Sequence, residues 1–310
     1  MNNRNLLLKR GVVSAIAVFC CLLWGSAAPC IKIAYRLFSI GSSDIKDQIL
    51  LAGIRFFFAG VLTILFGSLI SRKPLIPKGK ESLKMIVSLA MVQTVIQYFF
   101  FFVGVANTTG FKTAIINGTG TFFSILAACF VFRYEKMTAR KILGCLLGFV
   151  AIVIINLNSA DGSGSFTFLG DGFLFLSVLS NALVAGMIKR FSKKENPVVL
   201  SGYQFMLGGL IMAAGAFILG GRLHASNPSA YLIVLYLSFV AAAAYTLWSV
   251  LLKYNPVSAV TIFVPVNPIS GVFLSAFLLG EADTIDWGRC LVALVLITLG
   301  ILAVNTEKRS

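Results

Sequence analysis

The stretch Ile49–Ile70, ILLAGIRFFFAGVLTILFGSLI, decides the fold class of this chain of 310 residues. It carries a single charged side chain, Arg55, and an α-helix of about 20 apolar residues is long enough to cross about 30 Å of hydrocarbon. Its apolar residues follow one another without the period-two alternation of a membrane β-strand. The stretch therefore predicts a membrane-spanning helix.

Similar apolar runs recur along the whole chain, separated by charged or Gly-, Pro- and Ser-rich breaks. The expected spans are residues 11–37, 49–70, 84–106, 110–132, 139–157, 168–190, 197–219, 229–253, 257–280 and 287–305. The composition agrees, because 58% of the residues are hydrophobic, 12% are charged and the mean hydropathy is +0.92. We expect an all-α integral membrane protein with ten transmembrane helices.

The basic residues indicate which side of the membrane each loop faces. Most of the 26 Lys and Arg residues lie in the loops on the side of both chain ends, for example at 72–84, 133–141 and 189–194. The positive-inside rule then places both termini in the cytoplasm of a multi-pass protein in a bacterial-type plasma (inner) membrane. Since the net charge of +15 is spread over these loops, we expect no nucleic-acid partner.

The two halves of the chain resemble each other. Residues 51–62 read LAGIRFFFAGVL and residues 200–211 read LSGYQFMLGGLI, with small and polar residues in the same order. This alignment pairs Gly53 with Gly202, Arg55 with Gln204, Phe56 with Phe205 and Gly60 with Gly209. The pattern Glu-x-x-Thr also recurs, at residues 135–138 and 281–284. A duplication explains the shared order better than the chance recurrence of common apolar residues.

A Gly- and Ser-rich linker at residues 159–166 separates the halves, which gives a first repeat of residues 1–158 and a second of residues 167–310. Five spans per half is an odd number, so the second half enters the membrane from the opposite side. We therefore expect two inverted five-helix repeats around a central cavity, in one membrane domain.

The order of short motifs resembles the EamA-type branch of the drug/metabolite transporter superfamily over nearly the whole chain. The matching residues are Trp24-Gly25-Ser26 with Ile31-Lys32, Arg55-Phe56, Gly170-Asp171, Tyr245-x-x-Trp248, and Pro268 ahead of Gly280-Glu281. The chain departs from the family pattern in the fourth span, where Phe122 replaces a frequent proline and Tyr134-Glu135 replaces a Gly-Glu pair. The resemblance implies ten helices around a cavity, and transport, often export, of amino acids, nucleosides or drug-like amphiphiles.

Helix-breaking residues interrupt the fourth and ninth spans near their middles. Carbonyl groups freed by such breaks persist in hydrocarbon only where they face protein, water or ligand, so paired breaks predict a central binding site. A kink that only serves packing is the alternative. The expected helix breaks are Pro29, Gly118, Gly120, Pro265 and Pro268.

Arg55 is the sharpest single candidate, since an arginine within a span costs about 2.5–3.5 kcal/mol on insertion scales. Its guanidinium either attracts a carboxylate or phosphate of the substrate, or snorkels or bonds a neighbouring helix. The other cavity candidates are polar or aromatic residues at membrane depth: Trp24, Gln97, Tyr98, Asn117, Asn181, Tyr203, Gln204, Tyr245, Trp248 and Asn267. Each of these could instead belong to the core or to the interface belt.

These features predict a carrier that moves small organic metabolites, amino acids or similar amphipathic solutes, by alternating access, as an exporter or a facilitator or exchanger. The acidic residues fall in loops or at span ends and His224 lies in a loop, which favours facilitated diffusion or exchange over the alternative, a proton-coupled multidrug exporter. An ion channel or an intramembrane enzyme is less favoured, because no filter-like loop and no cluster with metal spacing is apparent. We expect a small-molecule substrate, contact with lipid, no catalytic residue, no metal, no cofactor, and a monomer or weak dimer.

Overall fold

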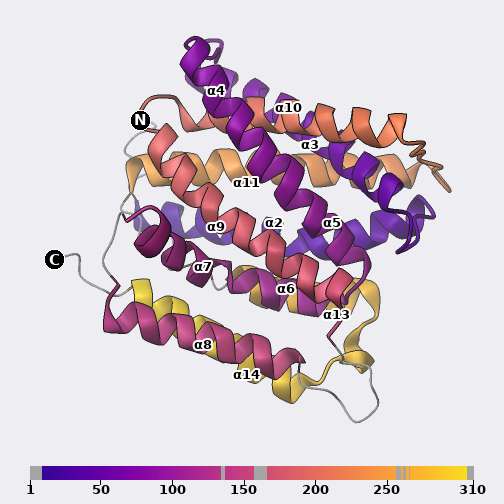
Figure 1. Cartoon of the computed structure of the whole chain (residues 1–310), viewed down its shortest axis with the longest axis vertical. Helices are drawn as coiled ribbons and strands as arrows, with labels where there is room; N and C mark the ends of the chain where they lie inside the picture. The colour runs from indigo at the N-terminus through magenta and orange to yellow at the C-terminus, as the bar shows by residue number, and fades with distance from the viewer. Residues whose placement is uncertain are drawn as a thin grey trace.

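The computed structural model describes residues 9–133, 137–156, 166–255, 260, 263–264 and 266–305. Within these ranges the chain forms α-, π- and 3₁₀-helices and no β-strand, and the long helices run side by side as a bundle (Figure 1). In chain order the elements are α2 (Arg10–Leu37), α3 (Ile45–Ser71), α4 (Lys80–Leu89), η1 (Ala90–Gln97), α5 (Tyr98–Ala106), α6 (Gly110–Gly118), α7 (Gly120–Leu126), η2 (Ala127–Val131), α8 (Ala139–Asn156), η3 (Phe168–Gly172), α9 (Phe173–Phe191), α10 (Pro197–Ile218), α11 (Ser229–Tyr254), α13 (Val266–Leu279), η4 (Ala282–Thr284) and α14 (Trp287–Asn305).

Several of these helices are long and apolar enough to cross a bilayer. Among the described residues, seven stretches meet that criterion: Gly11–Leu37, Ile45–Ser71, Lys80–Ala106, Gly110–Val131, Phe168–Ile188, Pro197–Ile218 and Ser229–Trp248. Val266–Leu279 and Trp287–Ala303 are shorter apolar helices. The predicted class, an all-helical multi-pass membrane protein, is confirmed.

The outer surface of the bundle is apolar, as lipid contact requires. Large exposed side chains include Leu69, Ile218 and Phe277. A soluble helical bundle would place charged and polar residues on this surface instead. The polar side chains at membrane depth are mostly turned inward, as described below for the candidate site.

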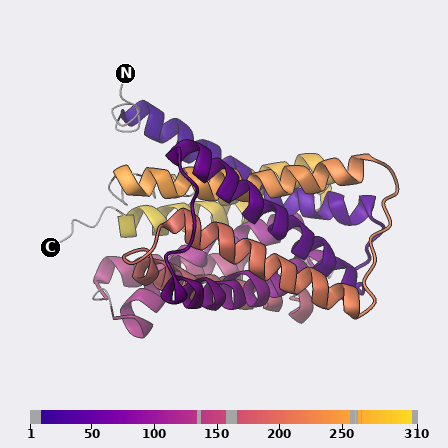
Figure 2. The same cartoon turned by 90° about the horizontal axis from the view of Figure 1, so that it is seen from above.

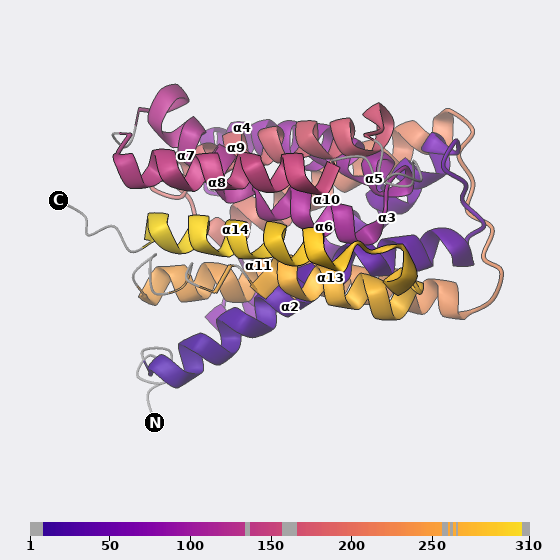
Figure 3. The same cartoon turned by 90° about the horizontal axis from the view of Figure 1, so that it is seen from below.

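Both ends of the described chain lie at one end of the bundle. Figures 2 and 3 show the start of α2 and the end of α14 on the same side. We call this the terminal end, and we call the opposite end, where α3 and α9 begin, the far end.

α3 and α10 cross with their backbones in close contact. A Cβ atom added to Gly53 would lie 2.3 Å from the amide nitrogen of Ala213, and one added to Gly60 would lie 2.5 Å from the carbonyl oxygen of Gly202. From the other helix, a Cβ atom on Gly209 would lie 2.7 Å from the carbonyl oxygen of Gly53. Small residues are what allow two membrane helices to approach this closely.

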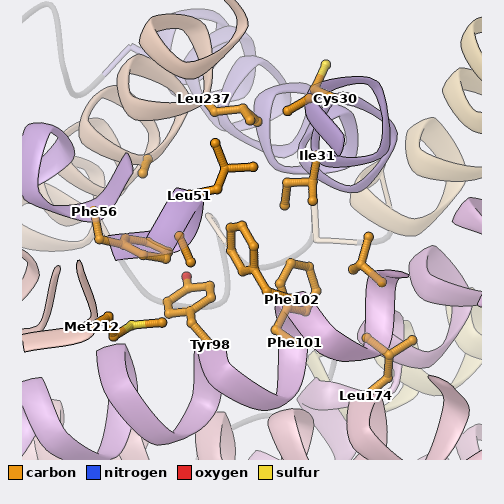
Figure 4. Packing of buried hydrophobic residues seen from close by; sticks show 14 of the residues in the cluster. Cys30, Ile31, Leu51, Phe56, Tyr98, Phe101, Phe102, Leu174, Met212 and Leu237 are labelled. Carbon is orange, nitrogen blue, oxygen red and sulfur yellow. The ribbon is translucent and has the colours of Figure 1, made fainter. Parts of the chain in front are cut away.

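The other helices pack around this pair. α2 lies against α11 and α13, α9 lies against α5, η1 and α7, and α8 lies along α14 at one side of the bundle (Figure 1). The largest apolar core joins α2, α3, α5, α10 and α11, and Figure 4 shows Ile31, Phe56, Phe102 and Leu237 at its centre. The crossing and this core fix the positions of the polar residues between them.

The helix breaks expected from sequence have mixed outcomes. The chain does break at Gly118–Gly120, where α6 ends and α7 begins. Pro29 was wrong as a break, because α2 runs through it as one helix. Neighbouring helices at close range, here α13 beside Gly25, let a membrane helix tolerate an internal proline. Pro268 lies in the first turn of α13, where a missing N–H costs little, and Pro265 lies outside the described residues.

Candidate functional site

A chain of hydrogen bonds joins η1 to α10 and α11 inside the bundle. Gln204 on α10 donates from Nε2 to Oε1 of Gln93 at 2.8 Å and accepts from the hydroxyl of Thr94 at 2.9 Å. Gln93 in turn donates to the hydroxyl of Tyr245 at 3.3 Å, and that hydroxyl lies 3.3 Å from the hydroxyl of Tyr98. A connected network of this kind holds its helices in one mutual arrangement.

The network starts from a stretch of π-helix in the middle of the third expected span. η1 interrupts the α-helical turns between α4 and α5, and π-helical stretches of this kind are frequent at functional sites. Ser180 on α9 donates a hydrogen bond to the carbonyl of Val92 at 2.9 Å, so a neighbouring helix binds a carbonyl group of η1. The sequence had singled out Gln97 but missed Gln93 and Thr94. Their signal was the spacing of Gln93 and Gln97 four residues apart in an apolar run.

Arg55 lies in the core, only 4% exposed, on α3. Its Nε donates to the carbonyl oxygen of Leu237 on α11 at 3.2 Å, whereas its Nη1 is buried with no hydrogen-bond partner. The guanidinium carbon lies 4.9 Å from the ring centroid of Phe56 and 5.6 Å from that of Phe102. The charge is therefore held by one carbonyl group and by aromatic rings.

Aromatic side chains connect the hydrogen-bonded network to the middle of α2. The ring of Trp24 lies 5.8 Å from that of Tyr245 and 5.0 Å from that of Trp248, between centroids. Trp24, Tyr245 and Trp248 are only half-buried. The structure thus brings together three residues from the first and eighth expected spans as an aromatic lining.

Asn181 is exposed although it points into the bundle. On α9, Leu179 and Leu183 are exposed toward the lipid, and at about 100° per residue Asn181 lies on the opposite side of the helix. Leu174 and Val178 on that inner side are buried. Solvent therefore reaches the inner side of α9 at Asn181.

The helix break at Gly118–Gly120 meets the first turn of α13 beside this region. A Cβ atom on Gly118 would lie 3.0 Å from Cβ of Pro268, and one on Gly25, next to Trp24, would lie 2.9 Å from the carbonyl oxygen of Asn267. Asn117 and Asn267 are half-buried at this level. The break in the fourth expected span and the first turn of α13 in the ninth are thus neighbours in space.

Exposure along α6 and α7 changes from one end to the other. Thr113, one turn toward the far end from Asn117, is completely buried, whereas Ser124 and Ala128 toward the terminal end are half-buried. The side chains on this face of α6 and α7 are therefore more buried toward the far end than toward the terminal end.

One predicted cavity residue lies elsewhere. Tyr203 packs in a separate apolar cluster with Met85 and Val199, and its hydroxyl donates to the carbonyl of Leu75 at 3.2 Å. Tyr203 precedes Gln204 by one position, so it projects about 100° away from it around α10. Its assignment to the central cavity was wrong for that reason.

Buried charges meet at the far end. Nζ of Lys112 on α6 lies 3.3 Å from Oδ2 of Asp171 in η3, and both side chains are almost fully buried. Asp171 also accepts from the hydroxyl of Thr108 at 2.8 Å, and Glu281 accepts from the backbone N–H of Gly110 at the start of α6. Lys112 and Asp171 are 59 positions apart in the chain, and the sequence could not show that they meet.

A second carboxylate is held at the terminal end. Glu195, between α9 and α10, accepts hydrogen bonds from the hydroxyl of Ser82 and from the backbone N–H groups of Lys78 and Asn196. Burial acts to raise the pKa of the Glu195 carboxyl, but these hydrogen bonds, together with the charge of Lys78, outweigh it and lower that pKa below its usual value.

Comparisons with known proteins agree with this geometry. The EamA-like transporter family model matches residues 11–157 and residues 168–306. The chain belongs to the EamA-like transporter family. It is therefore a membrane transporter, and the hydrogen-bonded interior just described is the interior of an EamA-like protein.

Curated relatives resemble this EamA-like protein over most of its length. The uncharacterized transporter YetK of Bacillus subtilis is 27% identical over 81% of this chain and 79% of its own length. The uncharacterized inner membrane transporter YedA of Escherichia coli K12 is 26% identical over 97% of this chain and 94% of its own. A solved structure with 18% identity superposes with a TM-score of 0.63 over 96% of this chain and 97% of that chain, which shows the same fold.

Proposed function

We propose that this transporter is an alternating-access carrier for small amphipathic organic solutes, of the size and character of amino acids. In this proposal it works as an exporter or as a facilitator or exchanger in the cytoplasmic membrane. Ten spans form two inverted five-helix repeats, and both termini lie in the cytoplasm. The substrate binds between the aromatic lining of Trp24, Tyr245 and Trp248 and the polar residues Asn117, Asn181 and Asn267.

The observation that carries the proposal is the exposure of Asn181 on the inner side of α9. A membrane bundle that served only as a scaffold would fill this position with an apolar side chain, because an unsatisfied polar group in hydrocarbon is costly. A solvated polar group at mid-depth, beside a helix break, is the arrangement that carriers use to bind solutes.

Two observations support the inverted repeat. The same family model matches each half of the chain separately. In addition, Gly53 faces Gly209 while Gly60 faces Gly202 across the α3–α10 crossing, and the sequence alignment pairs Gly53 with Gly202 and Gly60 with Gly209. This reciprocal contact is what a two-fold axis between α3 and α10 produces.

The neighbours of the remaining helices support the same axis. α2 packs against α11 and α13, and its repeat partner α9 packs against the third span, η1 and α5, and the fourth, α7. α8 packs against its own partner α14. Phe56 likewise stacks on its partner Phe205, with ring centroids 5.3 Å apart.

The polar contacts at the far end support one particular state of the cycle. Lys112 belongs to the first half, whereas Asp171 and Glu281 belong to the second, so both polar contacts join the halves. We propose that the far end is the outer side and that the protein is here closed outward. Both contacts then have to separate when the outer side opens.

The test is flux into proteoliposomes with a panel of labelled amino acids, nucleosides and amphipathic drugs. The proposal predicts saturable uptake with competition between related solutes. Asn181→Trp should block this flux by filling the inner side, whereas Leu183→Trp, on the lipid side of the same helix, should retain it. Equal flux in the two variants, or an unsaturable ohmic conductance, contradicts the proposed site or the proposed mechanism.

Energy coupling has its own test. Facilitated diffusion or exchange predicts that a pH gradient alone drives no net substrate current, while an outward gradient of unlabelled solute accelerates uptake of the labelled one. A robust current driven by the pH gradient would favour the proton-coupled alternative, for which the buried carboxyl of Asp171 would be the first candidate.

A further inference from the structure

We propose that Arg55 is the anion-binding residue of the substrate site, and that the preferred substrates carry one carboxylate on an apolar or aromatic body. This inference rests on the proposed carrier function and names its substrate class. It starts from a hydrogen-bond donor of Arg55 that the protein itself leaves unpaired. Nη1 of the guanidinium is buried without a hydrogen-bond partner, and a buried donor left unpaired is costly.

The position that corresponds to Arg55 in the second half shows what a purely structural residue looks like at this depth. The side-chain amide of Gln204 donates a hydrogen bond to Gln93 and accepts one from Thr94. Gln204 is as deeply buried as Arg55. Arg55 makes one bond, to Leu237, at the same level of its own helix. A residue that only links helices would need no positive charge there, since the neutral Gln204 links them more completely.

No buried acidic side chain in the described part of the chain is paired with this charge. The buried acidic side chains among the described residues are Asp171, which pairs with Lys112, and Glu195, which accepts from Ser82. Both therefore serve other partners at the two ends of the bundle. Phe56 and Phe102 offer only the faces of their rings. An uncompensated guanidinium in such surroundings binds a carboxylate far more strongly than one in water does.

A path of aromatic residues leads from Arg55 to the solvated region. The ring of Tyr98 lies tilted against that of Phe56 with centroids 4.0 Å apart, its hydroxyl lies 3.3 Å from that of Tyr245, and the ring of Tyr245 touches that of Trp24. The separation of the two hydroxyls is longer than the usual 2.7–2.8 Å, so this contact is weak. Parting the tyrosine pair would open the guanidinium to a bound solute.

The charge count selects a carboxylate over a phosphate. A phosphate group carries up to two negative charges and is usually held by several cationic groups. Lys112 is already paired with Asp171 near the far end, and Lys141, the other buried cation among the described residues, lies in the first turn of α8. The aromatic walls favour an apolar or aromatic body on the same molecule.

The test compares three probes that each carry one phenyl ring, 3-phenylpropionate, 3-phenylpropionamide and phenyl phosphate, on the purified protein. Binding is followed by tryptophan fluorescence, because Trp24 and Trp248 lie on the aromatic path. The wild type should bind the carboxylate about tenfold or more tightly than the amide and than the phosphate. Arg55→Gln should bind the carboxylate and the amide with about equal affinity, and its affinity for the amide should be that of the wild type. Arg55→Lys should retain part of the preference for the carboxylate.

Arg222→Gln is the matched control, because Arg222 also stacks on a phenyl ring, that of Phe217, but at the exposed surface. It should leave all three affinities unchanged. The proposal is overturned if the wild type binds none of the probes or prefers the phosphate. It is also overturned if Arg55→Gln keeps the preference for the carboxylate or weakens both ligands alike, which is the behaviour of a structural residue.

The failure of this inference and that of the proposed function are distinguishable. A protein that prefers the carboxylate through Arg55 but gives no flux in proteoliposomes retains the anion site and is not a carrier. A protein that transports the amide as well as the carboxylate, with or without Arg55, is a carrier without this anion site.

Discussion

Lys112 and Arg55, two of the buried cations among the described residues, are held in opposite ways. Lys112 is 4% exposed and lies 3.3 Å from the equally buried Asp171. Arg55 is just as buried, but it has one carbonyl partner and two phenyl rings, and one of its nitrogen atoms has no partner. The first charge is complete within the protein and lies at the far end, whereas the second is incomplete and lies toward the interior.

We infer from this difference that one buried charge serves the stability of the fold and the other serves the recognition of a substrate. Removing one partner of a buried ion pair leaves a charge without compensation, so Lys112 and Asp171 depend on each other for stability. Arg55 has no such acidic partner among the described residues, so the free-energy cost of burying its charge is already present in the folded wild type. We therefore expect stability to depend strongly on the first pair and selectivity to depend on Arg55.

The largest effect on stability should come from Asp171→Ala. It strands the buried ammonium group of Lys112, and we expect a loss of about 3–5 kcal/mol in the free energy of unfolding. Titration with denaturing detergent in mixed micelles measures this loss. The double variant Asp171→Ala with Lys112→Met should regain most of the lost stability. An Asp171→Ala variant as stable as the wild type would show that the ion pair does not hold the far end together.

A smaller loss should follow Gln204→Leu, at the repeat partner of Arg55. The change strands the amide oxygen of Gln93 and the hydroxyl of Thr94, and we expect a loss of about 2 kcal/mol. The same detergent titration measures it. Gly215→Ala is the control on α10, because a Cβ atom there meets nothing within 4 Å. A loss no greater than that of the control would mean that the hydrogen-bonded network does not stabilise the fold.

Arg55→Gln should cost less than Gln204→Leu. It gives up one hydrogen bond, to Leu237, but it also removes a charge from an apolar environment, and we expect a net change within about 1 kcal/mol of zero. Thermal unfolding in detergent, with Arg222→Gln alongside, measures the difference. A loss as large as that of Asp171→Ala would make Arg55 a structural residue and remove the contrast between the two cations.

The smallest effect concerns the carboxylate at the terminal end and depends on pH. The pKa of Glu195 is lowered in the folded state, so its ionised carboxylate contributes to the free energy of unfolding. This contribution is fully present above the unfolded pKa of about 4.3 and is lost as pH falls through the lower folded pKa. Glu195→Gln should therefore cost about 1 kcal/mol at pH 7 and less at acidic pH. Melting temperatures of the wild type and variant measured from pH 7 downward should converge, and a constant gap would contradict the lowered pKa.

Sequence alone anticipated much of the central region, for identifiable reasons. Gly118 and Gly120 broke the helix as expected, because glycine lacks the side chain that stabilises a helical turn at that point. Trp24, Tyr245 and Trp248 came together because an inward face of a membrane helix selects amphipathic side chains.

The errors also have physical causes. Pro29 stayed within its helix, since a bundle supplies packing partners that sequence does not reveal. Tyr203 projects away from the network, because polarity alone does not give the angle of a side chain around its helix. Gln93 and Thr94 make their hydrogen bonds from the π-helical turns of η1, and the sequence did not predict these turns.

The apolar runs, their length and the order of small residues in the two halves determined the class of this protein, because hydrocarbon demands continuous apolar helices and close crossings demand glycine. The pairing of Lys112 with Asp171, the contact of Gly118 with Pro268 and the unpaired donor of Arg55 were decided by the tertiary structure. Each joins residues far apart in the chain, and burial and distance, which set the energy of a charge, exist only once the helices have packed.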